Sequence, residues 1–183
     1  MIQASLLFDN SLPTGGSKIP VGIHSKVMFM GVVKDGSYVD INFQNDSGQQ
    51  IHKRLFTPDG SRPKEGESAA EAIERQQTNN LKHLVHMLRV VYGDDAVQSI
   101  EAPTYDKFIE KCVTLLNPKK GFLVNLKVVF DRSGKWPDLG FFPSSYVEAF
   151  SEGKEVSLKF TKTEQEAINT NSGEKKADDD LPF

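Results

Sequence analysis

The fold of this chain is decided by residues 23–57, IHSKVMFMGVVKDGSYVDINFQNDSGQQIHKRLFT. Residues 23–34 are rich in β-branched and aromatic side chains, which favours a strand. Asp35-Gly36 is a tight-turn signal, and residues 38–44 then alternate apolar with polar side chains as a half-buried strand does. A second turn at Asp46-Ser47-Gly48 leads into a third strand over residues 51–57. Two successive hairpins predict a three-stranded antiparallel meander, the opening half of many small barrels.

The period of the apolar residues changes after this meander. From Ala69 to Val91 they recur at helical spacing, and Gly93 is a stop signal. A second helix is expected between Thr104, its N-cap, and Asn117-Pro118. We therefore predict one helical insertion, residues 66–117, between the third strand and the fourth.

Strand character returns after the insertion. Residues 122–131 alternate again, and residues 131–135, Asp-Arg-Ser-Gly-Lys, indicate a turn or mobile loop. We expect a short strand around Phe141-Phe142 and a last edge strand over residues 156–160. The predicted fold class is mainly β, within α+β. Its architecture is a five-stranded Greek-key barrel of the OB type, with the helical insertion after the third strand.

The end of the chain differs from the rest in composition. Beyond about Thr163 the apolar content collapses, which is typical of disorder. We expect one folded domain over residues 1–162 and a disordered acidic tail over residues 163–183. The tail holds six acids and two lysines, −4, so the net charge of −3 leaves +1 for residues 1–162. A body so close to neutral needs a local basic face if it is to bind a polyanion.

Composition also restricts the protein class. With 38% hydrophobic and 26% charged residues, the chain resembles neither a disordered nor a membrane protein. No apolar run approaches the roughly 20 residues of a membrane span, and the N-terminus lacks the features of a signal peptide. The single cysteine, Cys112, excludes an internal disulfide and favours a reducing compartment. We expect a soluble cytoplasmic protein.

The most specific motif is the chain end, Asp178-Asp179-Asp180-Leu181-Pro182-Phe183. An apolar tripeptide closing a polar tail has the form of a short linear ligand. Phe183 can fill an apolar pocket while its carboxylate meets an Arg or Lys, and the aspartates can steer toward a basic rim. A merely solubilising tail would account for the acids but not for the apolar ending.

These six residues resemble the C-terminal tip of bacterial and phage single-stranded DNA-binding proteins. In that family the tip binds helicases, nucleases, polymerases or primases. The segment Pro20–Val27 and the two hairpins after it resemble the start of the OB domain in phage-encoded members. The helical insertion and the missing Gly/Pro/Gln-rich linker depart from the bacterial housekeeping form, which points to a phage or mobile-element protein. The resemblance implies a protein that coats single-stranded DNA in replication, recombination or repair, and it leaves the oligomeric state open.

A second signal is the mixture of basic and aromatic residues on the presumed binding strands and loops. An OB groove stacks bases on aromatic rings and pairs phosphates with Lys and Arg. Tyr38 and Trp136 are the strongest stacking candidates, Trp136 because it sits in a polar loop. The predicted DNA-binding set is Lys26, Lys34, Tyr38, Lys53, Arg54, Phe56, Arg62, Lys127, Arg132, Lys135 and Trp136.

Two other function classes are alternatives to DNA binding. An OB-fold adapter or recombination mediator that does not itself bind DNA tightly would carry the same tail, and the near-neutral body favours it. An enzyme would need a catalytic or metal-binding constellation. His83 and His86 lie three apart without a carboxylate or Cys at ligand spacing, so we expect surface or partner-facing histidines. We expect no catalytic residues, metal or cofactor.

Overall fold

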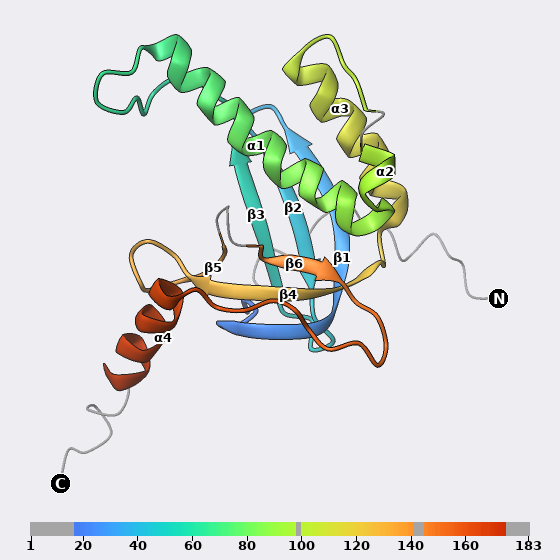
Figure 1. Cartoon of the computed structure of the whole chain (residues 1–183), viewed down its shortest axis with the longest axis vertical. Helices are drawn as coiled ribbons and strands as arrows, with labels where there is room; N and C mark the ends of the chain where they lie inside the picture. The colour runs from blue at the N-terminus through green and yellow to red at the C-terminus, as the bar shows by residue number, and fades with distance from the viewer. Residues whose placement is uncertain (1–16, 98–99, 141–144, 175–183) are drawn as a thin grey trace, which may run out of the picture.

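The computed structural model describes residues 17–97, 100–140 and 145–174. Within them the chain forms an open antiparallel sheet of six strands with helices packed against it (Figure 1). The strand order is β3-β2-β1-β4-β5, and β6 pairs with β4. The elements are β1 (Gly22–Asp35), β2 (Tyr38–Gln44), β3 (Gln50–Phe56), α1 (Ala69–Tyr92), α2 (Asp94–Val97), α3 (Tyr105–Leu116), η2 (Asn117–Lys119), β4 (Leu123–Phe130), β5 (Pro137–Leu139), β6 (Val147–Ala149) and α4 (Lys162–Glu174).

The predicted meander is confirmed. β1, β2 and β3 pair in sequence order, and Asp35 lies opposite Tyr38 across the first turn. β1 is long enough to pair with β2 through its C-terminal half and with β4 through its N-terminal half. The ladder is interrupted by bulges between Phe29 and Gly31 and between His24 and Val27. Because bulges increase strand twist, β1 can pass from one half of the sheet to the other.

The barrel does not close, which corrects the predicted five-stranded architecture to an α+β fold with an open sheet. β3 and β5 are at opposite ends of the strand order. β5 and β6 have only three residues each, and β5 begins with Pro137, which has no N–H to donate. These strands are too short to build a backbone ladder around the whole circumference. The expected strand at Phe141-Phe142 lies outside the described residues.

The prediction of an edge strand over residues 156–160 is wrong. This segment is not part of the sheet, and side-chain hydrogen bonds hold it against the sheet. The carboxylate of Glu148 accepts hydrogen bonds from the backbone N–H and the hydroxyl of Ser157. Lys127 Nζ donates to the carbonyl of Lys159 at 3.1 Å. Leu158, which lies between Ser157 and Lys159 in the chain, is buried.

Both predicted helices are confirmed, and their caps explain their limits. Ser68 and Glu71 form a reciprocal capping box at the start of α1. Gly93, at φ 84°, ends α1 with its N–H bonded to Arg89 O at 2.8 Å. Thr104 caps α3 by accepting a hydrogen bond from the Lys107 N–H. The helical segment follows β3 and precedes β4, as expected.

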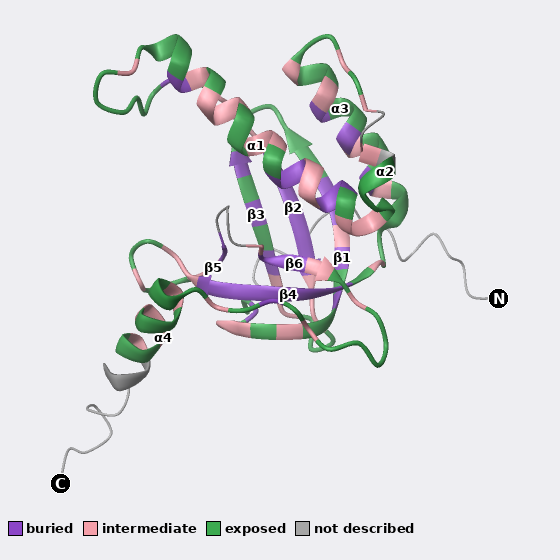
Figure 2. Cartoon of the chain, viewed as in Figure 1, coloured by how far each residue is buried: buried purple, intermediate pink, exposed green. Residues whose placement is uncertain are grey.

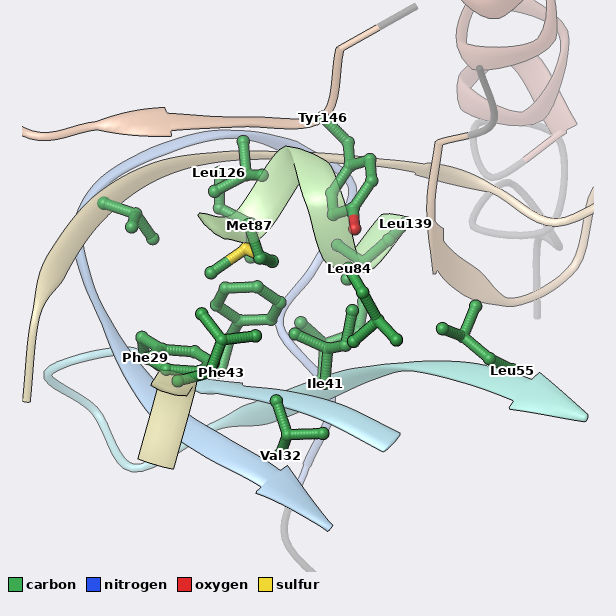
Figure 3. Packing of buried hydrophobic residues seen from close by; sticks show 14 of the residues in the cluster. Phe29, Val32, Ile41, Phe43, Leu55, Leu84, Met87, Leu126, Leu139 and Tyr146 are labelled. Carbon is green, nitrogen blue, oxygen red and sulfur yellow. The ribbon is translucent and has the colours of Figure 1, made fainter. Parts of the chain in front are cut away.

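This helical segment belongs to the core of the domain. Leu84 and Met87 of α1 are fully buried. Figure 3 shows them between Ile41 of β2 on one side and Leu126 and Tyr146 on the other. The burial pattern in Figure 2 agrees, since β2 and β4 are almost wholly buried while β3 alternates. The helix therefore fills space that, in a closed barrel, the strands alone would enclose.

A helix replaces the first part of the predicted disordered tail. α4 covers Lys162–Glu174. Its start is another capping box: Glu164 N donates to Thr161 Oγ1 at 3.3 Å, and Thr161 N donates to Glu164 Oε2 at 2.8 Å. The sequence contains this Thr-x-x-Glu capping signal, but the polar composition of the segment led to the prediction of disorder.

Candidate nucleic-acid interface

The outward face of β2 and β3 carries a stacked arginine–tyrosine pair. Tyr38 lies opposite Phe56 and Asp40 opposite Arg54, so these four side chains share one face. Arg54 donates from Nε to Asp40 Oδ1 at 2.9 Å and from Nη2 to Oδ2 at 2.6 Å. The guanidinium carbon lies 4.0 Å from the centroid of the Tyr38 ring. The buried Asp40 carboxylate thus holds the guanidinium plane over the phenol ring.

Three large apolar side chains are exposed on the same face. Phe56 is 65% exposed, Val33 43% and Met28 41%. In the β1–β2 register Val33 lies opposite Asp40 and Met28 opposite Gln44, which places both on the outward side. Of these three, Phe56 carries an aromatic ring, the kind of side chain on which nucleic-acid bases stack, and it lies beside the Arg54 plane.

The loop between β4 and β5 is organised around one carboxylate. Asp131 Oδ1 accepts hydrogen bonds from Ser133 N at 3.1 Å and Ser133 Oγ at 2.7 Å. The same oxygen accepts from the backbone N–H groups of Lys135 at 3.2 Å and Trp136 at 3.3 Å. These bonds lower the pKa of Asp131, the Ser133 hydroxyl having the largest effect. The result is a shaped loop in which Trp136 is 62% exposed and Arg132 and Lys135 are exposed.

Lys53 does not lie with the outward cations, which corrects its predicted placement. It points inward from β3 and is 4% exposed. Its Nζ donates to the carbonyl of Leu139 in β5 at 2.7 Å and lies 3.9 Å from Asp138 Oδ1. Burial lowers the pKa of Lys53 to about 8. Lys53 shares the inward parity of Ile51 and Leu55 in β3, so the alternation pointed inward, and only the charge of the side chain suggested the surface.

Lys127 is a second correction. It lies on β4 with 0% exposure, and its Nζ is 2.9 Å from Glu164 Oε2 and 3.1 Å from Lys159 O. The C-terminal segment therefore covers the position from which Lys127 was expected to reach phosphate. Removing one partner of a buried ion pair is strongly destabilising, because the other charge is left buried and unpaired. We therefore assign Lys127 the role of anchoring α4 on β4.

The other predicted cations are spread over the surface. Lys26 lies in the bulge of β1 at φ 58°, with its Nζ 5.5 Å from the Phe150 ring centroid. Lys34 forms an ion pair with Glu110 of α3 at 3.7 Å. Arg62 is exposed in the connection between β3 and α1. The structure therefore brings Tyr38, Arg54 and Phe56 together on one face but not these three cations.

Sequence reasoning missed the two acids that organise the interface. Asp40 is one of the polar residues of the alternating segment 38–44, and its pairing with Arg54 depends on the β2–β3 register. Asp131 was placed in a turn or mobile loop. The pattern Asp-x-Ser-Gly at residues 131–134 is a signal for an Asx-type turn and could have indicated an ordered loop.

The two histidines of α1 are not the surface residues that the sequence suggested. His83 is 6% exposed, and its Nδ1 lies 3.3 Å from the hydroxyl of Tyr146, which is fully buried. His86 is half-buried, with Nε2 3.0 Å from Val147 O and 3.0 Å from Ser145 Oγ. Burial lowers the pKa of both rings, that of His83 to about 3, and raises the pKa of Tyr146.

The buried His83 predicts a loss of stability in acid. Its pKa is about 3 in the folded state and about 6.5 when unfolded, so the unfolded chain binds an extra proton between these values. Folding stability should therefore fall as pH drops from about 6.5 toward 3, by a few kcal/mol at most, since each pKa unit is worth about 1.4 kcal/mol. Urea unfolding at pH 7 and pH 4.5 measures it. His83→Gln should lose clearly less stability than the wild type between the two pH values; equal losses would contradict the assignment.

A groove of about 530 Å³ lies between the C-terminal part of α1 and β6. Its lining includes the bases Arg89 and Lys159 together with the acids Asp94 and Glu148. This balance of charge does not favour a polyanion. The outward face of β2 and β3, with the β4–β5 loop, remains the better candidate for nucleic acid.

No protein-family model, curated protein or solved structure matches this chain. Among the described residues, no cluster of three or more His, Cys, Asp or Glu could hold a metal ion. None of the helices in the described part of the chain is long and apolar enough to cross a membrane. The predicted partner-binding tip, Asp178–Phe183, lies outside the described residues.

Proposed function

We propose that this protein binds single-stranded DNA without sequence preference and protects it during replication, recombination or repair. The observation that carries the proposal is the platform of Tyr38, Arg54 and Phe56 on the outward face of β2 and β3. The exposed ring of Phe56 can accept any base through its π-face, and the Arg54 plane, which lies over Tyr38, adds a cation–π contribution. Such a surface favours unpaired bases, because paired bases keep their faces inside the duplex.

The strand connectivity supports an OB-type interpretation of the open sheet. OB folds bind oligonucleotides on the face of strands 2 and 3, flanked by the loops between strands 1 and 2 and between strands 4 and 5. Here the platform lies on β2 and β3, and Trp136 lies in the β4–β5 loop. β1 is shared between β2 and β4, and the helices lie between β3 and β4.

The charges of the residues suggest which of them contact phosphates, which contact bases and which bind other proteins. Arg132 and Lys135 are exposed beside Trp136 and are the described cations best placed to pair with phosphates near a stacked base. Arg54 contributes its plane more than its charge, because Asp40 is paired with it. The acidic tip, Asp178 to Phe183, is proposed to remain available for replication or recombination proteins in the cytoplasm.

The direct test is a titration with oligo(dT) at low and moderate salt. Each phosphate contact releases counterions, so log K should fall linearly with log[salt], with a slope of about −0.7 per contact. We expect binding at low salt and a slope that corresponds to a few contacts. Fluorescence anisotropy of a labelled oligonucleotide measures both.

Two outcomes of this titration would contradict the proposal. One is an absence of binding at low salt, and the other is an affinity that salt does not change. A chain lacking residues 178–183 is the matched control for the tail. It should bind oligo(dT) as tightly as the full chain, or more tightly, because removing three aspartates reduces repulsion of the phosphates.

A second candidate is an adapter whose sheet face binds protein. The observation that favours it is the low number of exposed cations on this face, since Arg54 is neutralised by Asp40 while Lys53 and Lys127 are buried. Exposed Phe56, Val33 and Met28 would suit an apolar protein contact. A protein that ignored oligo(dT) at low salt while folded would favour the adapter.

A further inference from the structure

The gap between β3 and β5 is bridged by a buried lysine. β3 and β5 are not hydrogen-bonded neighbours in the sheet. Lys53 Nζ, from β3, donates to the carbonyl oxygen of Leu139 in β5 at 2.7 Å. It also lies 3.9 Å from the carboxylate of Asp138, the preceding residue of β5. A charged donor to a carbonyl is among the stronger hydrogen bonds, and burial shields it from water.

The strand that Lys53 contacts also carries the predicted stacking residue. β5 begins at Pro137, directly after Trp136, and pairs with β4 through only three residue pairs. Leu139 is buried in the core (Figure 3). Lys53 therefore contacts β5 at Asp138 and Leu139, two and three residues after Trp136.

Charged and titratable groups from three different elements surround the ammonium group of Lys53. The groups that interact with it electrostatically are Asp138 of β5, Arg132 of the β4–β5 loop and His83 of α1. Arg132 acts on Lys53 as a like charge and lowers its pKa, whereas Asp138 acts as the opposite charge and raises it.

We propose that Lys53 is a positioning residue that fixes β5 and the Trp136 loop against β3, so that the loop and the outward face of β2 and β3 form one single-stranded DNA site. This inference rests on the proposed function. It adds that Trp136 and Phe56 act on the same strand of DNA, although β3 and β5 share no backbone ladder.

Lys53→Met tests the proposal, because methionine keeps the apolar stem and removes the donors. Oligo(dT) titration is followed by anisotropy and by quenching of Trp136, which is the single tryptophan. The variant should bind about tenfold more weakly, equivalent to losing one stacked base, and should lose most of the tryptophan quench. Lys53→Arg, which keeps charged donors, should recover part of the quench.

A loss of stability alone must not be mistaken for a positioning effect. Ile109→Ala, in the buried face of α3, is a destabilising control on a helix that packs against α1 and β1. With its fold verified by circular dichroism, it should retain both affinity and quench. If Lys53→Met bound with the affinity and quench of the wild type, the positioning role would be overturned while the proposed function stood. If the wild type itself did not bind oligo(dT), the proposed function would fail.

A second measurement needs no variant and therefore does not depend on its folding. Hydrogen exchange of the wild type is followed with and without oligo(dT). A single site predicts that the peptides covering residues 50–57 and 131–139 become protected together, over the same range of oligonucleotide concentration. Protection of only one of the two would overturn the inference.

Discussion

Replacing both Trp136 and Phe56 with alanine is expected to weaken oligo(dT) binding by about 30-fold or more. Each stacked base contributes about 1–3 kcal/mol by alanine substitution, and 1.4 kcal/mol corresponds to a tenfold change in affinity. Both side chains are more than half exposed, so their removal leaves no cavity in the core and should change stability little. Affinity is measured by anisotropy at low salt, where phosphate contacts remain strong.

The matched control is Leu115→Ala. Leu115 is also an exposed apolar residue, at 37%, but it lies on α3, where its carbonyl accepts a hydrogen bond from Tyr92 of α1. This variant should bind oligo(dT) like the wild type. An unchanged affinity in the Trp136/Phe56 double variant would remove base stacking on this face from the mechanism and leave the adapter as the better candidate.

Leu84→Ala is expected to reduce the free energy of unfolding by about 2–5 kcal/mol, the usual cost of truncating a buried leucine. Leu84 is fully buried between the two halves of the sheet, as Figure 3 shows. For a domain of this size such a loss is a large part of the total stability. Urea unfolding followed by circular dichroism measures it.

Lys82→Ala is the control on the same helix. Lys82 is exposed on α1, and its replacement should change stability by no more than about 0.5 kcal/mol. If Leu84→Ala cost as little as Lys82→Ala, α1 would be a peripheral insertion and not an element of the core. The difference between the two variants therefore separates these descriptions of the helical segment.

The interface was only partly predictable from the residues. Tyr38, Arg54 and Phe56 all belong to the predicted DNA-binding set, but the register that places them on one face is a property of the folded β2–β3 hairpin. Lys53 and Lys127 were expected at the surface because lysine is rarely buried without a partner. Their partners, Leu139 O and Glu164, lie 86 and 37 residues further along the chain, and no local pattern indicates such a contact.

Local signals alone determined the meander, α1 and α3. Alternation, turn residues and caps act within a few residues, so they can be identified wherever they occur along the chain. Only the tertiary structure decided that the sheet stays open, that α1 enters the core, and that α4 is anchored on β4. These outcomes depend on which distant side chains meet, Lys127 with Glu164 and Leu84 with Ile41. Their energies come from burial and from pairing inside the fold, and those terms do not exist until the chain has folded.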